Sequence, residues 1–297
     1  MGRRRRRQGP TRSGGAVFWK PAGITSRRAV EEAERRLGVR PLGHTGTLDP
    51  LAAGILVVLG GEARKFQHLI TDHDKCYEAR VVLGIESGSE DAEGPLWCRT
   101  PRLSLHEPAA VEAAVAGFEG SYEQTPPQLS AVRVAGERAH KRARRGEDVA
   151  VPARSVRIDR IEIVDCAPPL LQLRVACGPG TYIRSLARDL GERLGTGAFL
   201  AGLRRTAVGT FQEADAKPLT ALTSGDWLPL EEIVRDAPRV DVPRATAERL
   251  ALGQRVPHAV LPDDLAVVWC DGAVVGIAEP RGEVLQPRRW VQPDDSR

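Results

Sequence analysis

The sequence is poor in aromatic and sulfur-containing side chains and has no long apolar run. Aromatic residues make up 4% of the 297 residues, and there is a single methionine. The cysteines are Cys76, Cys98, Cys166, Cys177 and Cys270. Their odd number and the lack of a CxxC pair argue against a disulfide framework or a cysteine-bound zinc ion, and favour a reducing compartment. No segment approaches the ~20 apolar residues of a membrane span, and no secretory signal is recognisable. We therefore expect a soluble, cytoplasmic protein.

Several common catalytic motifs are also missing. The six histidines show no HExxH or HxH spacing, so no metal site is expected. Neither a GxxxxGKS/T loop nor a GxGxxG loop is present to cradle phosphates, and no GxSxG turn carries a nucleophilic serine. The chemistry that remains is a carboxylate acting as a nucleophile or base, and such a group should stay ionised beside a cation.

Positive charge is concentrated in two places. The net charge is +4, but Arg3 to Arg7 and Arg12 contribute six positive charges, which leaves −2 for the rest of the chain. Residues 1–13 are predicted to be a disordered basic tail, either a loose RNA contact or a solubilising or mis-assigned start. The second cluster has six cations and one acid, Glu137; the cations are Arg133, Arg138, Lys141, Arg142, Arg144 and Arg145. This cluster suits either an RNA contact or a solvated helix face.

Hydrophobic periodicity predicts a mixture of strands and helices. Strands are expected at 16–19, 55–59, 76–83, 156–163 and 171–177, with a bulge in the fourth. Helices are expected after a cap at Thr25 or Ser26 as far as Gly38, at 107–118 and at 183–194. The prediction is an α+β fold with a mixed, largely antiparallel sheet and flanking helices.

The chain is expected to hold two folded domains. Residues 14–235 form the larger one, and the acidic, proline-containing stretch 212–242 is a plausible connection to the second. Residues 238–297 are predicted to form a small β-barrel-like module from short strands at 265–269, 273–278 and 283–285. Asp271-Gly272 between the first two strands is a hairpin signal.

The segment 43–54, GHTGTLDPLAAG, is the densest group of residues that could carry chemistry. Its three glycines and one proline predict a shaped loop between regular elements. Asp49 precedes proline, which favours an extended backbone that can present the carboxylate outward. From these residues alone, Asp49 is better explained as a turn or cap residue than as a catalyst, and His44 as a satisfied polar side chain.

Five motifs in order resemble the TruB family of bacterial tRNA pseudouridine(55) synthases. They are KPAGITS (20–26), GHTGTLDPLAAGILVVLGGEARKF (43–66), DKCY (74–77), GTYIR (180–184) and LRR (203–205). The resemblance covers residues 14–211. Residues 238–297 are similar to the C-terminal PUA domain of the family, through Gly276, Pro287, Arg288 and Arg289. The resemblance implies a pseudouridine synthase fold followed by a PUA-like RNA-binding domain.

The resemblance also implies an isomerase that converts uridine 55 of the tRNA T-loop to pseudouridine, without a cofactor. Asp49 would be the essential carboxylate, attacking C1′ or C6 of the uridine or removing a ribose proton. Arg184 would pair with it and lower its pKa, and is otherwise a surface arginine in the first turn of a helix. Tyr77 would stack on the flipped-out base and assist proton loss at C5. The alternative for this tyrosine is a place in the core.

Further binding residues follow from the same resemblance. Tyr182 and Leu203 would line the pocket around the base, and His44 would help to extrude the nucleotide. Lys20 and Asp91 would support the pocket, and Lys20 is also counted among the residues expected to contact the RNA backbone. The other expected backbone contacts are Arg138, Lys141, Arg142, Arg144 and Arg145. The expected partner is the T-loop and T-stem of tRNA, and the expected state is a monomer without a metal ion.

Two rival functions remain open at this stage, and the sequence departs from the family at one motif position. Cys76 stands where relatives often carry a basic residue, which puts one expected phosphate contact in doubt but not the chemistry. A non-catalytic RNA-binding protein would share the same scaffold but would have no need of Asp49, Tyr77 and Arg184 together. A hydrolase that uses Asp49 with His44 is disfavoured because the sequence offers neither oxyanion donors nor a metal.

Overall fold

A computed structural model describes residues 12–98, 108–130, 132–134, 136–139, 142, 145–258 and 264–291 of the protein. Nearly all of the predicted basic tail lies outside these residues. The helices of four or more residues are α1 Ser26–Leu37, η1 Gly61–Phe66, α2 Gln67–Thr71, α3 Pro108–Ala116, α5 Ile183–Arg193, α6 Leu230–Ile233 and α7 Arg244–Ala251. Three short 3₁₀ turns occupy Glu213–Asp215, Leu219–Ala221 and Ser224–Asp226.

The strands fall into two large sheets and two small hairpins. The first sheet holds β1 Gly14–Lys20, β2 Leu42–His44, β3 Ala53–Gly60, β4 Lys75–Leu83, β7 Gly120–Gln124, β10 Arg154–Ala167, β11 Leu170–Cys177, β12 Ala198–Val208, β13 Phe211–Gln212 and β14 Lys217–Pro218. The second holds β15 Arg239–Asp241, β16 Val256–Pro257, β17 Ala266–Cys270, β18 Ala273–Arg281 and β19 Val284–Trp290. The hairpins are β5 Ile85–Ser87 with β6 Leu96–Cys98, and β8 Arg133–Val134 with β9 Glu137–Arg138.

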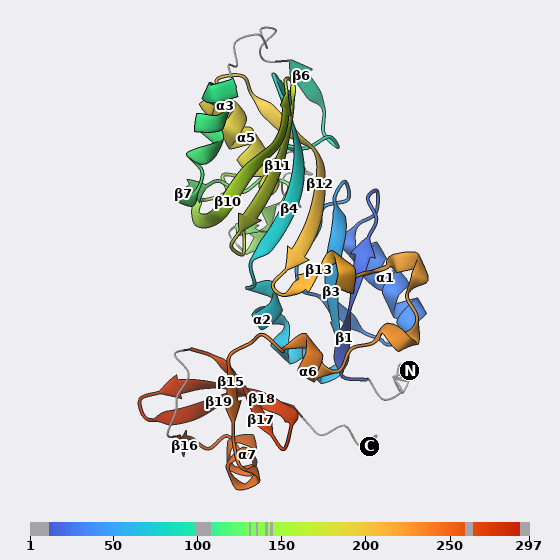
Figure 1. Ribbon diagram of the computed structural model, residues 1–297, viewed down its shortest axis with the longest axis vertical. Coiled ribbons are helices and arrows are strands. Elements are labelled where there is room, and N and C mark those ends of the chain that lie inside the picture. Colours follow the sequence, from blue (N-terminus) through green and yellow to red (C-terminus); the bar gives the residue numbers. More distant parts are fainter. Residues whose placement is uncertain are drawn as a thin grey trace.

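The ten-stranded sheet forms the long axis of the molecule (Figure 1). Its main path runs β14-β1-β3-β12-β4-β11-β10-β7, and β2 and β13 pair at its sides. All of its pairs are antiparallel except β1 with β14 and β3 with β12. The largely antiparallel α+β prediction is therefore confirmed. The parallel pairing of β3 with β12 matters for the site, because it places the middle of β12 beside the start of β3.

Helices cover the sheet where the sequence supplies an apolar stripe. In α1, Ala29, Ala33 and Leu37 are buried, and they pack against residues of β1 and β3. The helix begins where Thr25 Oγ1 accepts the amide of Arg28, and it ends at Gly38 in the left-handed conformation. Helices α3 and α5 lie together over β4, β10 and β11 (Figure 1). The predicted helix starts and stops are confirmed to within a few residues.

The five-stranded sheet is formed by the C-terminal residues that the sequence analysis predicts to be a separate small module. Its strands run in the order β15-β17-β18-β19-β16 (Figure 1). It has a core of its own, which includes Leu250 and Leu285. A second cluster joins it to the rest of the chain, because Val267 and Ile277 pack together with Phe66 of η1 and with residues of the large sheet such as Ile55. The two parts therefore share buried apolar surface.

The structure differs from the sequence prediction in two elements near the site. Residues 198–208 form the eleven-residue strand β12 at the centre of the large sheet, a strand that the sequence analysis did not predict. Within the predicted loop, Leu42–His44 form the short strand β2, which pairs with β3. The predicted bulge is confirmed by register shifts in β10 near Ile158 and Ile163.

Candidate active site

The loop that carries Asp49 is held from both sides by the KPAGITS segment. Ser26 Oγ donates to the carbonyl of Leu48 and accepts the amide of Leu48, each at 2.8 Å. The amide of Gly23 donates to the carbonyl of Pro50 at 2.7 Å. The residues immediately before and after Asp49 are thus fixed by backbone contacts, which leaves the carboxylate as the projecting group.

Lys20 supports this loop through its buried side chain. It is fully buried, and its ammonium donates to the carbonyls of Pro21 and Ile24 at 2.9 and 2.7 Å. Burial lowers the pKa of Lys20 to about 8. The expectation that Lys20 contacts the RNA backbone is wrong for this structure, because its charged end is turned inward. Its place fits the other expectation, support of the pocket.

Asp49 and Arg184 meet across 135 residues of sequence, as the family resemblance predicts. Arg184 Nε lies 2.9 Å from Asp49 Oδ2, and Nη2 donates to Oδ1 at 3.3 Å. The Arg184 side chain is 5% exposed, whereas that of Asp49 is 32% exposed. The alternative of a surface arginine is wrong. The pair joins a buried, fixed cation to a carboxylate that a substrate can reach.

The pKa of Asp49 differs from the expected direction. Arg184 lowers it, but burial of the carboxyl raises it by more, and the nearby Asp91 adds to the rise. The net pKa of Asp49 is therefore above that of an ordinary aspartate. Arg184 therefore lowers the free-energy cost of burying the charged carboxylate but does not cancel that cost.

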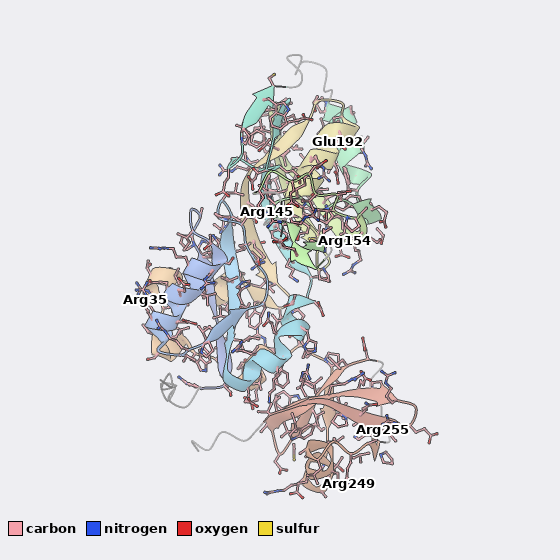
Figure 2. The ribbon with its side chains drawn as sticks, turned by 180° about the vertical axis from the view of Figure 1, so that it is seen from behind. Arg35, Arg145, Arg154, Glu192, Arg249 and Arg255 are labelled. Atoms are coloured by element: carbon pink, nitrogen blue, oxygen red, sulfur yellow. The ribbon has the colours of Figure 1, made fainter. Side chains whose placement is uncertain are left out.

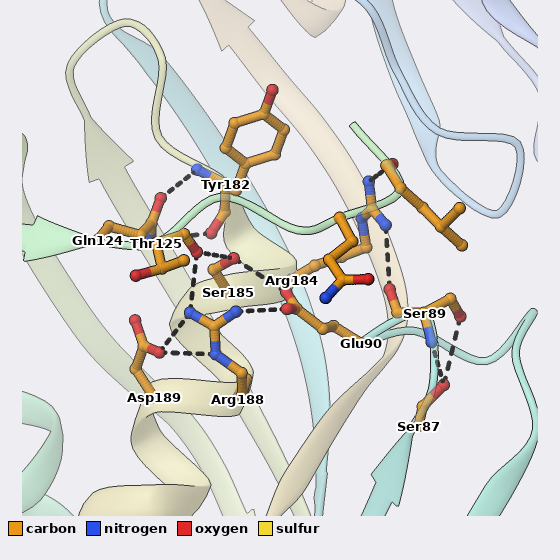
Figure 3. A network of polar contacts seen from close by, with 12 residues as sticks. Ser87, Ser89, Glu90, Gln124, Thr125, Tyr182, Arg184, Ser185, Arg188 and Asp189 are labelled. Carbon is orange, nitrogen blue, oxygen red and sulfur yellow. Dashed lines mark hydrogen bonds and ion pairs between the residues drawn. The ribbon is translucent and has the colours of Figure 1, made fainter. Parts of the chain in front are cut away.

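Arg184 is itself held by the segment 87–91 and by the end of the loop after β7. Its Nη1 donates to the carbonyl of Ser89 at 3.0 Å, and Nη2 donates to the carbonyl of Leu129 at 3.1 Å (Figure 3). Asp91 Oδ2 lies 3.7 Å from Arg184 Nε, and Asp91 is 2% exposed. The guanidinium therefore has a fixed orientation before any substrate arrives.

The next turn of α5 fastens the helix to the same segments. Arg188 pairs with Glu90 and Asp189 and donates to the carbonyl of Thr125 (Figure 3). Ser185 Oγ contacts Glu90 Oε2 and the carbonyl of Thr125, each at 2.9 Å. Sequence reasoning did not identify this network. Its members come from three separate elements, and no motif spacing links them.

The two predicted tyrosines occupy different environments. Tyr77 on β4 is 8% exposed, and burial raises the pKa of its phenol although Arg205 hydrogen-bonds to it. Tyr182 caps α5, and its amide donates to Gln124 Oε1 at 2.8 Å (Figure 3). The guanidinium of Arg154 lies 5.0 Å from the centre of its ring. Tyr77 thus belongs to the core cluster below the site, and Tyr182 stands at the start of the arginine-bearing helix.

Leu203 and His44 lie on the neighbouring strands. Leu203 on β12 is half-buried and packs against the core cluster that contains Tyr77. His44 on β2 has a buried Nδ1 without a hydrogen-bond partner. Burial lowers the pKa of His44, with a smaller contribution from Arg205. The imidazole is therefore neutral at physiological pH, and its unpartnered nitrogen contradicts the view of His44 as a satisfied polar side chain.

Arg205 is a site residue to which the sequence analysis gave no role. It is 2% exposed and donates to the carbonyls of Ile55 and Gly46 at 2.9 and 3.1 Å. Strand pairing sets it opposite both Gly54 and Tyr77. A Cβ at Gly54 would lie 2.3 Å from the carbonyl oxygen of Arg205, so only glycine fits there. The LRR motif was the one signal in the sequence that pointed to Arg205. The burial of this arginine cannot be read from the sequence.

The basic segment is described only in part. Lys141 and Arg144 lie outside the described residues, as does the side chain of Arg138. Arg142 contacts Glu147 at 2.7 Å, and Arg145 contacts Glu137 and Glu147, each at 2.8 Å. The RNA contacts expected of this segment stay predictions.

Three further observations concern the cysteines, possible metal ligands and possible membrane spans among the described residues. All five cysteines are free. No group of three histidine, cysteine or acidic side chains among the described residues could hold a metal ion. None of the described helices combines the length and apolar composition needed to cross a membrane.

Comparison with known families identifies the chain. Residues 34–183 match the TruB family pseudouridylate synthase N-terminal domain, and residues 184–236 match the tRNA pseudouridylate synthase B C-terminal domain. The chain belongs to the TruB family of pseudouridylate synthases. Its family activity is the isomerisation of uridine to pseudouridine in tRNA, which confirms the predicted enzyme class.

Curated relatives extend over nearly the whole chain. A tRNA pseudouridine synthase B of Synechococcus sp. (strain WH7803) is 41% identical over 93% of this chain and 96% of its own. One of Cupriavidus metallidurans is 40% identical over 92% of both chains.

Solved structures confirm the fold. The archaeal box H/ACA sRNP Nop10-Cbf5 complex aligns with a TM-score of 0.72 over 96% of this chain and 88% of its own, at 22% identity. A Cbf5-Nop10-Gar1 complex gives 0.72 over 95% and 86%, at 23% identity. The chain therefore has the pseudouridine synthase fold, and its curled C-terminal sheet fits a PUA-like domain.

Proposed function

We propose that the protein converts uridine 55 in the T-loop of tRNA to pseudouridine, with Asp49 as the essential carboxylate. The observation that carries this proposal is the contact between Asp49 and Arg184, a partly exposed carboxylate 2.9 Å from a buried guanidinium. The carboxylate keeps part of its surface open, as a group that must reach a substrate requires, while the arginine beside it stays buried.

The reaction rearranges bonds without oxidation or reduction. The N1–C1′ bond breaks, the uracil turns, C5 bonds to C1′, and the proton on C5 is lost while N1 gains one. Asp49 can attack C1′, attack C6 or remove a ribose proton, and each step requires the ionised form. Arg184 favours that form and holds the carboxylate in place. The proposed reaction needs no metal or redox cofactor.

The remaining residues receive the base. A uridine in a folded loop must leave its stack before its C1′, C5 and C6 can be reached. We assign Tyr77, Tyr182 and Leu203 to the surroundings of the flipped base, and neutral His44 to the space it leaves. We also assign to Tyr77, whose phenol is hydrogen-bonded to Arg205, a part in the loss of the proton at C5. Arg142, Arg145 and the rest of the basic segment would follow the RNA backbone.

The test is the Asp49→Asn variant, assayed by tritium release from C5-labelled uridine in tRNA and by mass mapping of the T-arm. Asparagine keeps the size of the side chain but cannot serve as nucleophile or base, so the rate should fall by at least about a thousandfold. Asp165→Asn, at an exposed aspartate on β10, is the matched control and should retain activity. Circular dichroism should show both variants folded.

Two outcomes would overturn the proposal. Release of tritium by Asp49→Asn at the wild-type rate would remove the carboxylate from the mechanism. Tight binding of tRNA by the wild-type protein without any pseudouridine would instead support a non-catalytic RNA-binding role.

A further inference from the structure

The first residues of helix α5 are held by the short segment 124–129, which connects β7 to the basic segment. The carbonyl of Thr125 accepts Ser185 Oγ at 2.9 Å, and the carbonyl of Leu129 accepts Arg184 Nη2 at 3.1 Å (Figure 3). Backbone carbonyls are present whatever the residue, so neither contact depends on the side chain at its position. Support that depends on the sequence must come from a side chain.

Gln124 provides such a side-chain contact. It is fully buried, and its Oε1 accepts the amide of Tyr182 at 2.8 Å while its Nε2 donates to the carbonyl of Tyr182 at 3.1 Å (Figure 3). One side-chain amide thus pairs with both backbone groups of a single residue, as a neighbouring strand would in an antiparallel sheet. Nε2 also donates to the hydroxyl of Tyr122. The orientation of the Gln124 amide is therefore fixed by three hydrogen bonds.

Tyr182 needs an outside partner because it caps α5 poorly. It is the N-cap residue, its backbone is extended, and among the described residues its side chain accepts no hydrogen bond from the first turn. The residues that usually cap a helix are serine, threonine, aspartate and asparagine, whose side chains bind the free amides of the first turn. The position of the helix start therefore depends on contacts from other segments, and Gln124 supplies two of them to the Tyr182 backbone.

Two groups of the site follow from this helix start. The Tyr182 ring points away from the side-chain amide that holds its backbone (Figure 3). Arg184 comes two residues later, with its Nε 2.9 Å from Asp49 Oδ2. The helix extends from Tyr182, which lies beside Arg154, to its last turn at Glu192 (Figure 2). A shift of the Tyr182 backbone would therefore move both the ring and the guanidinium.

We propose that Gln124 is a positioning residue for the reaction: by holding the backbone of Tyr182 it sets the ring that receives the base and the guanidinium that faces Asp49. The inference rests on the proposed function and adds to it a residue that does not touch the substrate. Because Gln124 is fully buried, it acts through Tyr182 and Arg184 and not by binding RNA. A purely structural role predicts that rate falls only as stability falls, whereas a positioning role predicts a loss of rate that an equal loss of stability does not reproduce.

The test compares Gln124→Met and Gln124→Glu with Tyr122→Phe. Methionine is similar in length to glutamine but forms neither hydrogen bond with Tyr182. Glutamate keeps the acceptor for the Tyr182 amide and lacks the amide donor, so it gives a second variant of the same size if Gln124→Met does not fold. Tyr122→Phe is the matched control, because it removes a hydrogen bond from the same buried amide and leaves both contacts with Tyr182.

Gln124→Met should lower kcat for pseudouridine formation by about 10- to 100-fold, because a small displacement of the reacting groups is enough for such a loss. The acid limb of kcat should move up by about half to one pH unit, because a displaced Arg184 favours the Asp49 carboxylate less. The Kd of unmodified tRNA should stay within about twofold of the wild-type value, since phosphate contacts dominate the affinity and the buried Gln124 makes none. Gln124→Glu should show the same changes to a smaller extent.

Tyr122→Phe should lower the Tm, as the Gln124 variants do, but leave kcat and the acid limb at their wild-type values. A folded Gln124 variant with wild-type kcat and an unmoved acid limb would overturn the inference. A fall of kcat in Tyr122→Phe as large as that in Gln124→Met would also overturn it, because the rate would then follow stability. Failure of the proposed function is a different result, in which the wild-type protein itself makes no pseudouridine.

Discussion

At the scale of single residues, the state of Asp49 results from a competition between burial and one arginine. Burial favours the neutral carboxyl group, and Arg184 favours the carboxylate. The balance leaves the pKa of Asp49 above its ordinary value of about 3.9. The catalytic form is therefore gained as the pH rises through this elevated pKa, and the acid limb of activity should lie above pH ~4.

Replacing Arg184 should move this acid limb to higher pH. Arg184→Gln removes the group that lowers the pKa of Asp49, so the limb should shift upward by about one to three pH units. Arg184→Lys keeps the charge without the two-point contact and should fall between wild type and Arg184→Gln. Single-turnover rates between pH 4 and 9 would measure the shift. A lower rate with an unmoved limb would contradict the assigned electrostatic role.

At the scale of elements, helix α5 carries Arg184, and its residues Ser185 and Arg188 attach the same helix to the segment that contains Glu90. Arg188 and Ser185 bind Glu90, whose backbone has a φ of 64°, a conformation that residues other than glycine seldom adopt. The same segment supplies the Ser89 carbonyl to Arg184. Glu90 therefore couples the position of the helix to that of Arg184.

Glu90→Gln should destabilise the protein and lower its activity. The change leaves the half-buried Arg188 without a full counter-charge, at a cost of about 1–3 kcal/mol in the free energy of unfolding. Glu31→Gln is the control, because Glu31 pairs with Arg27 in solvent and should cost less than about 1 kcal/mol. Urea unfolding would measure both. Equal costs for the two variants would show that the network adds nothing beyond a surface pair.

The elements also show where sequence reasoning succeeds and where it fails. In β4 and β11 apolar and polar residues alternate, and the burial of both strands follows that alternation. In β12 the run AGLRRT does not show this alternation of apolar and polar residues. Two arginines stand side by side in it, and Arg205 is buried while Arg204 is exposed. Its burial depends on the carbonyls of Ile55 and Gly46, which only the folded chain brings to it.

At the scale of the whole molecule, a shared core joins the large sheet and the C-terminal sheet into one unit of stability. Ile277 of β18 is fully buried in the cluster that contains Phe66 and Ile70 of the catalytic domain. Unfolding of either part therefore exposes apolar surface of the other.

Ile277→Ala should lower the stability of the whole protein by about 2–5 kcal/mol. Val164→Ala, at a side chain that is 53% exposed, is the control and should change stability by less than about 0.5 kcal/mol. Calorimetry of both variants would show whether the catalytic and C-terminal parts melt together. Two separate transitions, with only the smaller one shifted by Ile277→Ala, would contradict a shared core.

The sequence by itself determined the family and the fold class, limited the N-cap of α1 to Thr25 or Ser26, and through the family resemblance paired Asp49 with Arg184. These features depend on local spacing or on short motifs, which are present in the chain before it folds. The tertiary structure decided the net pKa shift of Asp49, the inward turn of Lys20 and the burial of Arg205. Each of these depends on desolvation and on contacts between distant segments, and neither quantity exists until the chain has packed.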